Sequence, residues 1–315
     1  MRITGDARGA FVMSATPFTA DGALDLDSAD RLVDFYLERR VHGITILGVT
    51  GEAHKLAHDE SVAFTRAVLR RVAGTVPVIV GVSNPGLDNL VRLAREAMEA
   101  GAAGVMVNAA AGPRAEDGVT AYFEKVFQAL GPEVPVCLQD YPQASGVFVS
   151  VETIRRLAER FPQIVMFKHE DAPGLRKLSQ LRRALDAAGR RLSIMVANNG
   201  IHLPQELARG ADGVMTGFAF PEMLIEVHER FAAGDREGAE DVFDAYLPLV
   251  RHEAQPGMGL AVRKEVLCRR GAIKSAAVRQ PGPTLDATDL EELDRLLARL
   301  ERRLAGLRGA AASRR

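Results

Sequence analysis

Short apolar runs rich in β-branched residues recur along the chain, and helical patterns separate them. There are eight such runs, at residues 10–15, 43–47, 77–80, 104–107, 134–138, 164–167, 192–196 and 213–215. Their residues are apolar in succession rather than in alternation, which indicates strands that are buried on both faces of a parallel sheet. Eight strand–helix units within roughly 250 residues predict a (β/α)8 TIM barrel, and an open doubly wound sheet is the competing fold.

Glycines support this strand count. Gly101 and Gly210 each follow a helical pattern and precede an apolar run, where a left-handed residue that ends a helix belongs. No Gly-x-Gly-x-x-Gly or phosphate-loop motif follows any run, which disfavours a nucleotide-binding sheet.

After residue 215 the chain has no further strand-like run. Helical patterns occupy residues 222–232, 235–251, 260–270 and 288–307. We therefore predict a barrel over residues 1–233, a C-terminal helical extension over residues 234–307 and a flexible tail over residues 308–315. The long helices of the extension invite self-association.

The composition excludes several classes of partner. Hydrophobic residues make up 47% of the 315, enough for one large core, and 40 basic residues against 41 acidic ones leave no basic face for nucleic acid. No apolar run approaches the roughly 20 residues that span a membrane. Cys137 and Cys268 lack the spacing of metal ligands or of a disulfide framework. We expect a soluble cytoplasmic protein without an export signal or a metal.

Lys168 stands where the sixth apolar run ends, and catalytic groups of such barrels gather at the C-terminal ends of strands. Only six of the 40 basic residues are lysine, so this chain usually supplies positive charge as arginine, whose guanidinium cannot form an imine. Lys168 is therefore a candidate Schiff-base nucleophile, kept neutral by desolvation. The alternative is an ion pair with Glu170 or Asp171. We expect His169 to face outward and pack.

A glycine-flanked turn, Gly48-Val-Thr-Gly-Glu52, follows the second run. Its backbone N–H groups and the Thr50 hydroxyl can hold a substrate carboxylate. The alternative is an ordinary turn in which Thr50 caps the next helix. Glu52 is expected to orient the loop or cap the helix rather than act as a base.

Polar residues also end the fifth run. Alternation along a strand places Cys137, Gln139 and Tyr141 on one face, so the Tyr141 phenol can reach the barrel mouth. There it could relay protons with Thr50. A buried tyrosine that only packs beside Pro142 is the alternative.

The remaining candidates for substrate binding lie near the ends of the fifth, seventh and eighth runs. Asn198 and Asn199 can bind hydroxyls, although Asn-Asn-Gly is also a turn sequence. Gln139, Ser145 and Met215 are further candidates for the pocket lining. A sugar-phosphate isomerase would need a glycine-rich phosphate turn after the seventh and eighth strands, and residues 197–200 and 216–218 give little support for one.

These motifs together resemble the dihydrodipicolinate synthase and N-acetylneuraminate lyase superfamily. The likeness rests on GVTGE after the second run, a lysine ending the sixth, and a Tyr-Pro turn with Ser-Gly-Val after the fifth, and it covers nearly the whole chain. The resemblance implies a class I aldolase or synthase on a (β/α)8 barrel, in which Lys168 condenses with pyruvate or another 2-keto acid. It further implies that Val49 and Thr50 hold the carboxylate, that no metal or other cofactor is needed, and that the protein is a homodimer or homotetramer.

The sequence departs from the family pattern at positions that matter for proton transfer. Gln139 stands where the family has its general acid/base tyrosine, and Ala144 stands where the synthase has an arginine for its aldehyde substrate. The paired tyrosines that link synthase subunits fall on Ala110 and Ala111. Because Gln139 cannot shuttle a proton at neutral pH, either Tyr141, water or the substrate does so, or the usual chemistry of the family is lost.

We therefore expect a Schiff-base lyase, aldolase or dehydratase that acts on pyruvate or another small 2-keto acid. Lys168 is the expected nucleophile, Thr50 with Val49 the carboxylate clamp, and Tyr141 the proton donor. One alternative is 4-hydroxy-tetrahydrodipicolinate synthase of lysine biosynthesis, which the departures above argue against. The alternative of another class is a barrel that binds keto acids without turnover.

Overall fold

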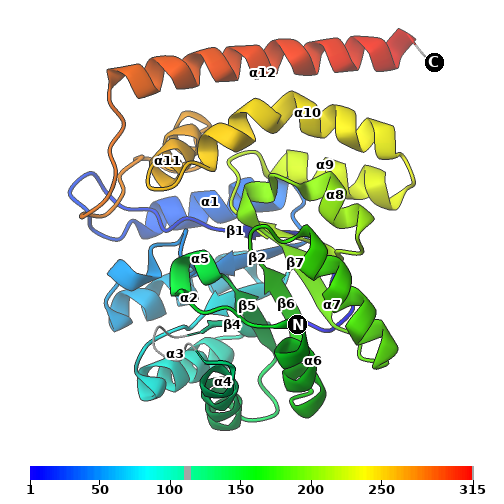
Figure 1. The fold of residues 1–315 in the computed structure, drawn as a ribbon. Coiled ribbons are helices and arrows are strands. Elements are labelled where there is room, and N and C mark those ends of the chain that lie inside the picture. The colour runs from blue at the N-terminus through cyan, green and yellow to red at the C-terminus, as the bar shows by residue number, and fades with distance from the viewer. Residues whose placement is uncertain (110–114, 314–315) are drawn as a thin grey trace.

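A computed structural model describes residues 1–109 and 115–313, and it contains the predicted barrel (Figure 1). All eight predicted strands are present, and each pairs in parallel with the next, so that β8 closes onto β1. This closure rules out the open doubly wound sheet. The strands are β1 Gly9–Met13, β2 Gly43–Ile46, β3 Val78–Gly81, β4 Gly104–Asn108, β5 Val136–Asp140, β6 Ile164–His169, β7 Ser193–Val196 and β8 Gly213–Thr216.

Helices follow each strand and surround the barrel (Figure 1). In the described ranges they are α1 Leu26–Glu38, α2 His58–Val72, α3 Leu87–Glu99, α4 Glu116–Leu130, α5 Pro142–Ser145, α6 Val151–Arg160, α7 Leu175–Ala187, α8 Leu203–Ala208, α9 Pro221–Ala232, α10 Arg236–Glu253, α11 Gly259–Arg269 and α12 Ala287–Ser313, with short 3-10 turns η1 Ala53–Lys55 and η2 Asn198–Gly200.

Local sequence explains where several of these helices begin. Asp25 accepts a hydrogen bond from the Ser28 amide at the start of α1, at 2.9 Å, and Asp235 caps α10 in the same way. Ser150 accepts from the Thr153 amide, at 3.1 Å, at the start of α6. Each cap satisfies a backbone donor that the helix itself cannot.

Side chains alternate between the inside of the barrel and the helical layer outside. The inner set is rich in methionine and is fully or almost fully buried: Ile3, Phe11, Met13, Ile79, Ala103, Met106, Cys137, Met166, Met195 and Met215. Phe11 fits inside because Gly43 lies beside it on β2: a Cβ at Gly43 would come within 2.3 Å of the Phe11 ring. A side chain at position 43 would therefore displace the ring.

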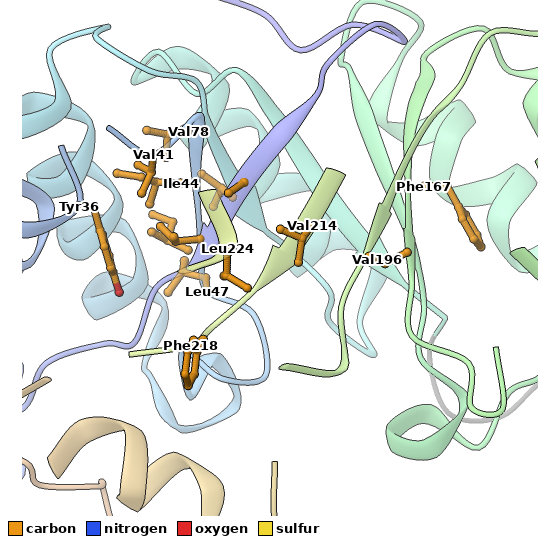
Figure 2. Packing of buried hydrophobic residues seen from close by; sticks show 14 of the residues in the cluster. Tyr36, Val41, Ile44, Leu47, Val78, Phe167, Val196, Val214, Phe218 and Leu224 are labelled. Carbon is orange, nitrogen blue, oxygen red and sulfur yellow. The ribbon is translucent and has the colours of Figure 1, made fainter. Parts of the chain in front are cut away.

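The outer set packs the strands against the helices. Phe167, Val196 and Val214 of the strands belong to one buried cluster with Leu224 of α9 and Tyr36 of α1 (Figure 2). Burial on both faces is the physical reason that the strands are apolar in succession.

The C-terminal extension consists of α10, α11 and α12. α12 lies along α10, on the side away from the barrel (Figure 1), and it buries Leu293 and Leu300. It runs to Ser313 and so includes residues 308–313, which the sequence analysis assigns to a tail; the division of the chain into three parts stays a prediction. Among the described residues, no helix combines the length and apolarity needed to cross a membrane.

Candidate active site

A small cavity of about 80 Å³ opens at the C-terminal ends of the barrel strands. Its lining comes from six strand ends: Met13, Val49, Thr50, Gln139, Tyr141, Lys168, Glu170, Asn198, Asn199, Thr216 and Gly217. Larger cavities of about 520 and 620 Å³ lie elsewhere on the molecule, but Lys168 lines neither of them. We place the site at the small cavity because chemistry-bearing side chains converge there.

Lys168 projects into this cavity from β6. It pairs in register with Gln139 of β5 and Met195 of β7, and Met166, two residues before it, belongs to the packed interior. The lysine is only 4% exposed, and its Nζ lies 2.7 Å from Oε1 of Glu170. The ion pair that the sequence offered as an alternative thus exists, but it lies inside the cavity rather than away from it.

Glu170 is the residue that the sequence analysis missed as a functional group. Its Oε1 also accepts a hydrogen bond from Gln139 Nε2 at 2.5 Å, and its carbonyl accepts one from Asn198 at 3.2 Å. The side chains of residues 168 and 170 reach the same cavity because alternate residues of a strand share a face. That same alternation, continued past Lys168, was the signal that would have found Glu170.

The turn after β2 brings Val49 and Thr50 to the cavity, as predicted. Thr50 caps no helix among the described residues, since α2 has Ala57 at its N-cap and η1 follows Glu52. The alternative reading of Thr50 as a cap is therefore wrong. Thr50 instead belongs to the lining of the cavity.

Glu52, the last residue of this turn, makes buried contacts with two lysines. It is completely buried in the left-handed conformation, at φ 54°, and accepts hydrogen bonds from Lys264 Nζ at 2.6 Å and Lys55 Nζ at 2.9 Å. Burial lowers the pKa of Lys264, and the Glu52 carboxylate opposes that shift. These buried contacts agree with the expectation that Glu52 orients the loop, which stays a prediction, and a left-handed backbone at a residue other than glycine is typical of functional turns.

Tyr141 lies in the cavity lining together with Gln139, as strand alternation predicts, while Cys137 lies deeper in the barrel interior. Burial raises the pKa of the Tyr141 phenol, and the nearby Glu170 carboxylate raises it further. A raised pKa favours the protonated phenol at neutral pH, which can donate a proton but not accept one. Burial likewise raises the pKa of Cys137 to about 12, so this thiol is inert.

Two residues predicted for the pocket lining lie elsewhere. Met215 is completely buried in the barrel interior, below the cavity. Ser145 ends the short helix α5, where its hydroxyl donates to the carbonyl of Tyr141 at 3.1 Å. Asn198 and Asn199 do line the cavity, and so does Thr216, which the sequence analysis did not propose for the substrate pocket.

Residues near the site behave as structural groups. His169 points outward as predicted, where it stacks on Phe167 and donates from its ring Nε2 to the carbonyl of Gly174 at 2.9 Å. Ala110 and Ala111 lie outside the described residues. Across the described ranges, no group of His, Cys, Asp and Glu side chains has the arrangement of a metal site.

Comparisons with known proteins agree with this architecture. A model of the dihydrodipicolinate synthetase family matches residues 6–300. The L-2-keto-3-deoxyarabonate dehydratase of Azospirillum brasilense is 32% identical over 302 residues, which cover 93% of this chain and 94% of that one. The 4-hydroxy-tetrahydrodipicolinate synthase of Sorangium cellulosum is 33% identical, with 94% of this chain and 96% of that one covered.

A solved structure is also similar over nearly the whole chain. The dihydrodipicolinate synthase structure from Rhodopseudomonas palustris is 46% identical, covers 95% of this chain and 99% of that chain, and has a TM-score of 0.92. Synthase and dehydratase thus both stand among the relatives. The chain belongs to the dihydrodipicolinate synthetase family, whose enzymes are lyases of the class I aldolase type that use a covalent lysine Schiff base and no external cofactor.

Proposed function

We propose that this enzyme dehydrates a small hydroxylated 2-keto acid, in which Lys168 forms the imine and Glu170 moves the protons. The observation that carries the proposal is the 2.7 Å contact between Lys168 Nζ and Glu170 Oε1 inside the cavity. A carboxylate at this distance can take a proton from the ammonium and return it. Gln139, which stands at the expected tyrosine position, holds that carboxylate by a hydrogen bond.

Imine formation follows from this pair. Transfer of one proton from Lys168 to Glu170 leaves a neutral amine, which attacks the C2 carbonyl of the keto acid. The C2 oxygen then receives one proton from the attacking nitrogen and one from the protonated carboxyl of Glu170, and it leaves as water. The product is a protonated imine on Lys168, with Glu170 again a carboxylate.

Dehydration uses the same carboxylate a second time. Glu170 removes a proton from C3, and the imine nitrogen takes up the electron pair as an enamine. The enamine then expels the C4 hydroxyl, which leaves as water with the proton from Glu170, and hydrolysis of the imine frees the amine. The net change is loss of one water from the substrate, with no oxidation or reduction. The printed activity of the Azospirillum relative supports this class of substrate.

The turn after β2 supplies the carboxylate site. Val49 and Thr50 line the same cavity as Lys168, and turn amides and a hydroxyl are suitable donors to an anion. Tyr141 is a second proton donor close to Glu170. We assign it a supporting role because the lysine, not the phenol, contacts the carboxylate directly, at 2.7 Å.

Synthase activity is the second candidate, favoured by the 46% identity to the Rhodopseudomonas structure. Against it, Ala144 provides no positive charge for a second carboxylate. We further propose that the enzyme is cytoplasmic and works as a homodimer or homotetramer. Two free cysteines suit a reducing compartment, and light scattering after gel filtration measures the assembly.

The test is to trap the imine. The protein is incubated with pyruvate and borohydride, and the Lys168 peptide is analysed by mass spectrometry, with Lys168→Arg as the control. We expect a reduced pyruvate adduct on Lys168 alone; an unlabelled peptide would refute the nucleophile. Turnover assays then compare a 2-keto-3-deoxy acid with pyruvate plus a carboxylate-bearing aldehyde. Release of a dehydrated keto acid supports the dehydratase, and condensation alone supports the synthase.

A further inference from the structure

Asn199 has an unusual hydrogen-bonding state for a residue that lines the cavity. Its Oδ1 accepts a hydrogen bond from Arg263 Nη2 at 2.9 Å, whereas its buried Nδ2 has no hydrogen-bond partner in the described part of the chain. Guanidinium nitrogens only donate, so Arg263 fixes the oxygen of the amide on its own side. The side-chain amide of Asn199 therefore has only its N–H donor left for a ligand.

Arg263 is itself held rigidly. Its Nε donates to Oε1 of Glu253, and the other oxygen of that carboxylate accepts from the Ala219 amide at 3.2 Å. The side chains of Arg263 and Glu253 are 6% and 0% exposed. Gly217 makes room for the guanidinium, because a Cβ there would lie 2.6 Å from Arg263 Nη1. These contacts and this burial hold the Arg263–Glu253 pair in place.

The backbone of Asn199 is fixed as well. Its amide donates to Thr216 Oγ1 at 3.0 Å, and it adopts the left-handed conformation at φ 56°. Arg263 belongs to α11 and Glu253 to α10, so a side chain of the barrel mouth is positioned by the C-terminal extension. The next residue of α11, Lys264, holds Glu52 behind the carboxylate-binding turn.

We propose that Arg263 and Glu253 are positioning residues that hold the Asn199 amide so that its N–H donates to an oxygen on the substrate beyond C2. This inference rests on the proposed function, in which the turn at Thr50 takes the carboxylate and Lys168 takes C2. The oxygen left for Asn199 is a hydroxyl of the remaining chain. An ammonium group there is excluded, since it cannot accept from an amide N–H and would face the charge of Arg263.

The consequence is selectivity for a hydroxylated acid over pyruvate, which has no such oxygen. The test measures the rate of trapped imine formation at Lys168 with a hydroxylated 2-keto-3-deoxy acid and divides it by the rate with pyruvate. Arg263→Lys retains a charge for Glu253 but cannot span both partners. We expect this ratio to fall about 10-fold in Arg263→Lys and in Asn199→Ala, as for the loss of one hydrogen bond.

The double variant that combines Arg263→Lys with Asn199→Ala separates a positioning role from a general loss of structure at the site. If Arg263 acts through Asn199, the double variant has the same ratio as Asn199→Ala alone. Lys264→Met is the matched control from the same helix, and it should lower both rates while the ratio stays within about twofold. Asn199→Ala keeps the pair of Arg263 with Glu253, so it still tests the hydrogen bond from Asn199 if Arg263→Lys fails to fold.

The outcomes distinguish the two proposals. Suppose that Lys168 is labelled in the wild type, but the ratio of rates is unchanged in Arg263→Lys or the effects of the two substitutions add in the double variant. That result overturns the positioning role and leaves the proposed function standing. Failure of the wild type to form an imine with either acid overturns the proposed function and this inference together.

Discussion

At the scale of single residues, the chemistry depends on where one carboxylate lies. Glu170 contacts the lysine nitrogen and the Gln139 amide, and both side chains lie in the cavity. A glutamine at position 139 cannot carry a proton, but it can hold and orient a carboxylate that does. A glutamine in the family's tyrosine position is thus consistent with the proposal that the acid/base group is Glu170, directly after β6.

Glu170→Gln tests that shift. The amide keeps the shape and the hydrogen bond to Gln139 but cannot accept the proton from C3, so we expect kcat to fall by at least about 100-fold. Asp171→Asn is the matched control, because Asp171 pairs with Lys177 at 3.0 Å outside the cavity lining. Its kcat should stay within about threefold of the wild type. Equal losses in both variants would contradict a special role for Glu170.

Tyr141→Phe separates the phenol from the carboxylate. Because burial and the charge of Glu170 raise the phenol's pKa, Tyr141 can donate but does not act as a base near neutral pH. We expect kcat of Tyr141→Phe to fall about 10-fold or less. Steady-state assays of Tyr141→Phe and Glu170→Gln compare the two losses of kcat. A loss larger than that of Glu170→Gln would transfer the acid/base role to Tyr141.

At the scale of elements, β2 shows how the barrel interior limits its own sequence. Gly43 faces the Phe11 ring of β1, and a methyl group there would overlap the ring. We predict that Gly43→Ala lowers the free energy of unfolding by about 1–3 kcal/mol, the usual effect of overpacking. Gly306→Ala is the control: it lies in α12 with no atom within 4 Å of the added carbon, and should stabilise by about 0.5–1 kcal/mol. Urea unfolding of both variants tests the opposite signs.

At the scale of the whole molecule, the sequence predicts the barrel well and the site in part. The eight apolar runs correspond to the eight strands because burial on both faces leaves a signal in each strand by itself. Lys168 and Thr50, which the sequence places at or just after strand ends, both line the cavity, while their roles stay predictions. Met215 was misplaced because alternation gives a side chain's face but not its depth in the barrel. Arg263 lies 64 residues after Asn199, and only the folded extension brings them together.

The pH dependence of stability is a further property of the whole fold. Glu206 of α8 is 5% exposed, and burial raises its pKa from 4.5 to about 7, while the neighbouring His169 opposes that shift. Between these pH values the native state binds more protons than the unfolded chain, so the free energy of unfolding falls as pH rises from about 4.5 to 7 and then levels off. The contribution of this one group is about 3 kcal/mol.

Glu206→Gln isolates this contribution, because the amide does not titrate. The free energy of unfolding of each protein is measured in urea at pH 5 and pH 8. The value of the variant minus that of the wild type should be larger at pH 8 than at pH 5, by up to about 3 kcal/mol. Glu291→Gln, an exposed glutamate of α12, should follow the wild type at both pH values. If the free energy of unfolding changed equally in wild type and Glu206→Gln between pH 5 and pH 8, Glu206 would be ionised in the native state at neutral pH. A partner would then have to stabilise its charge.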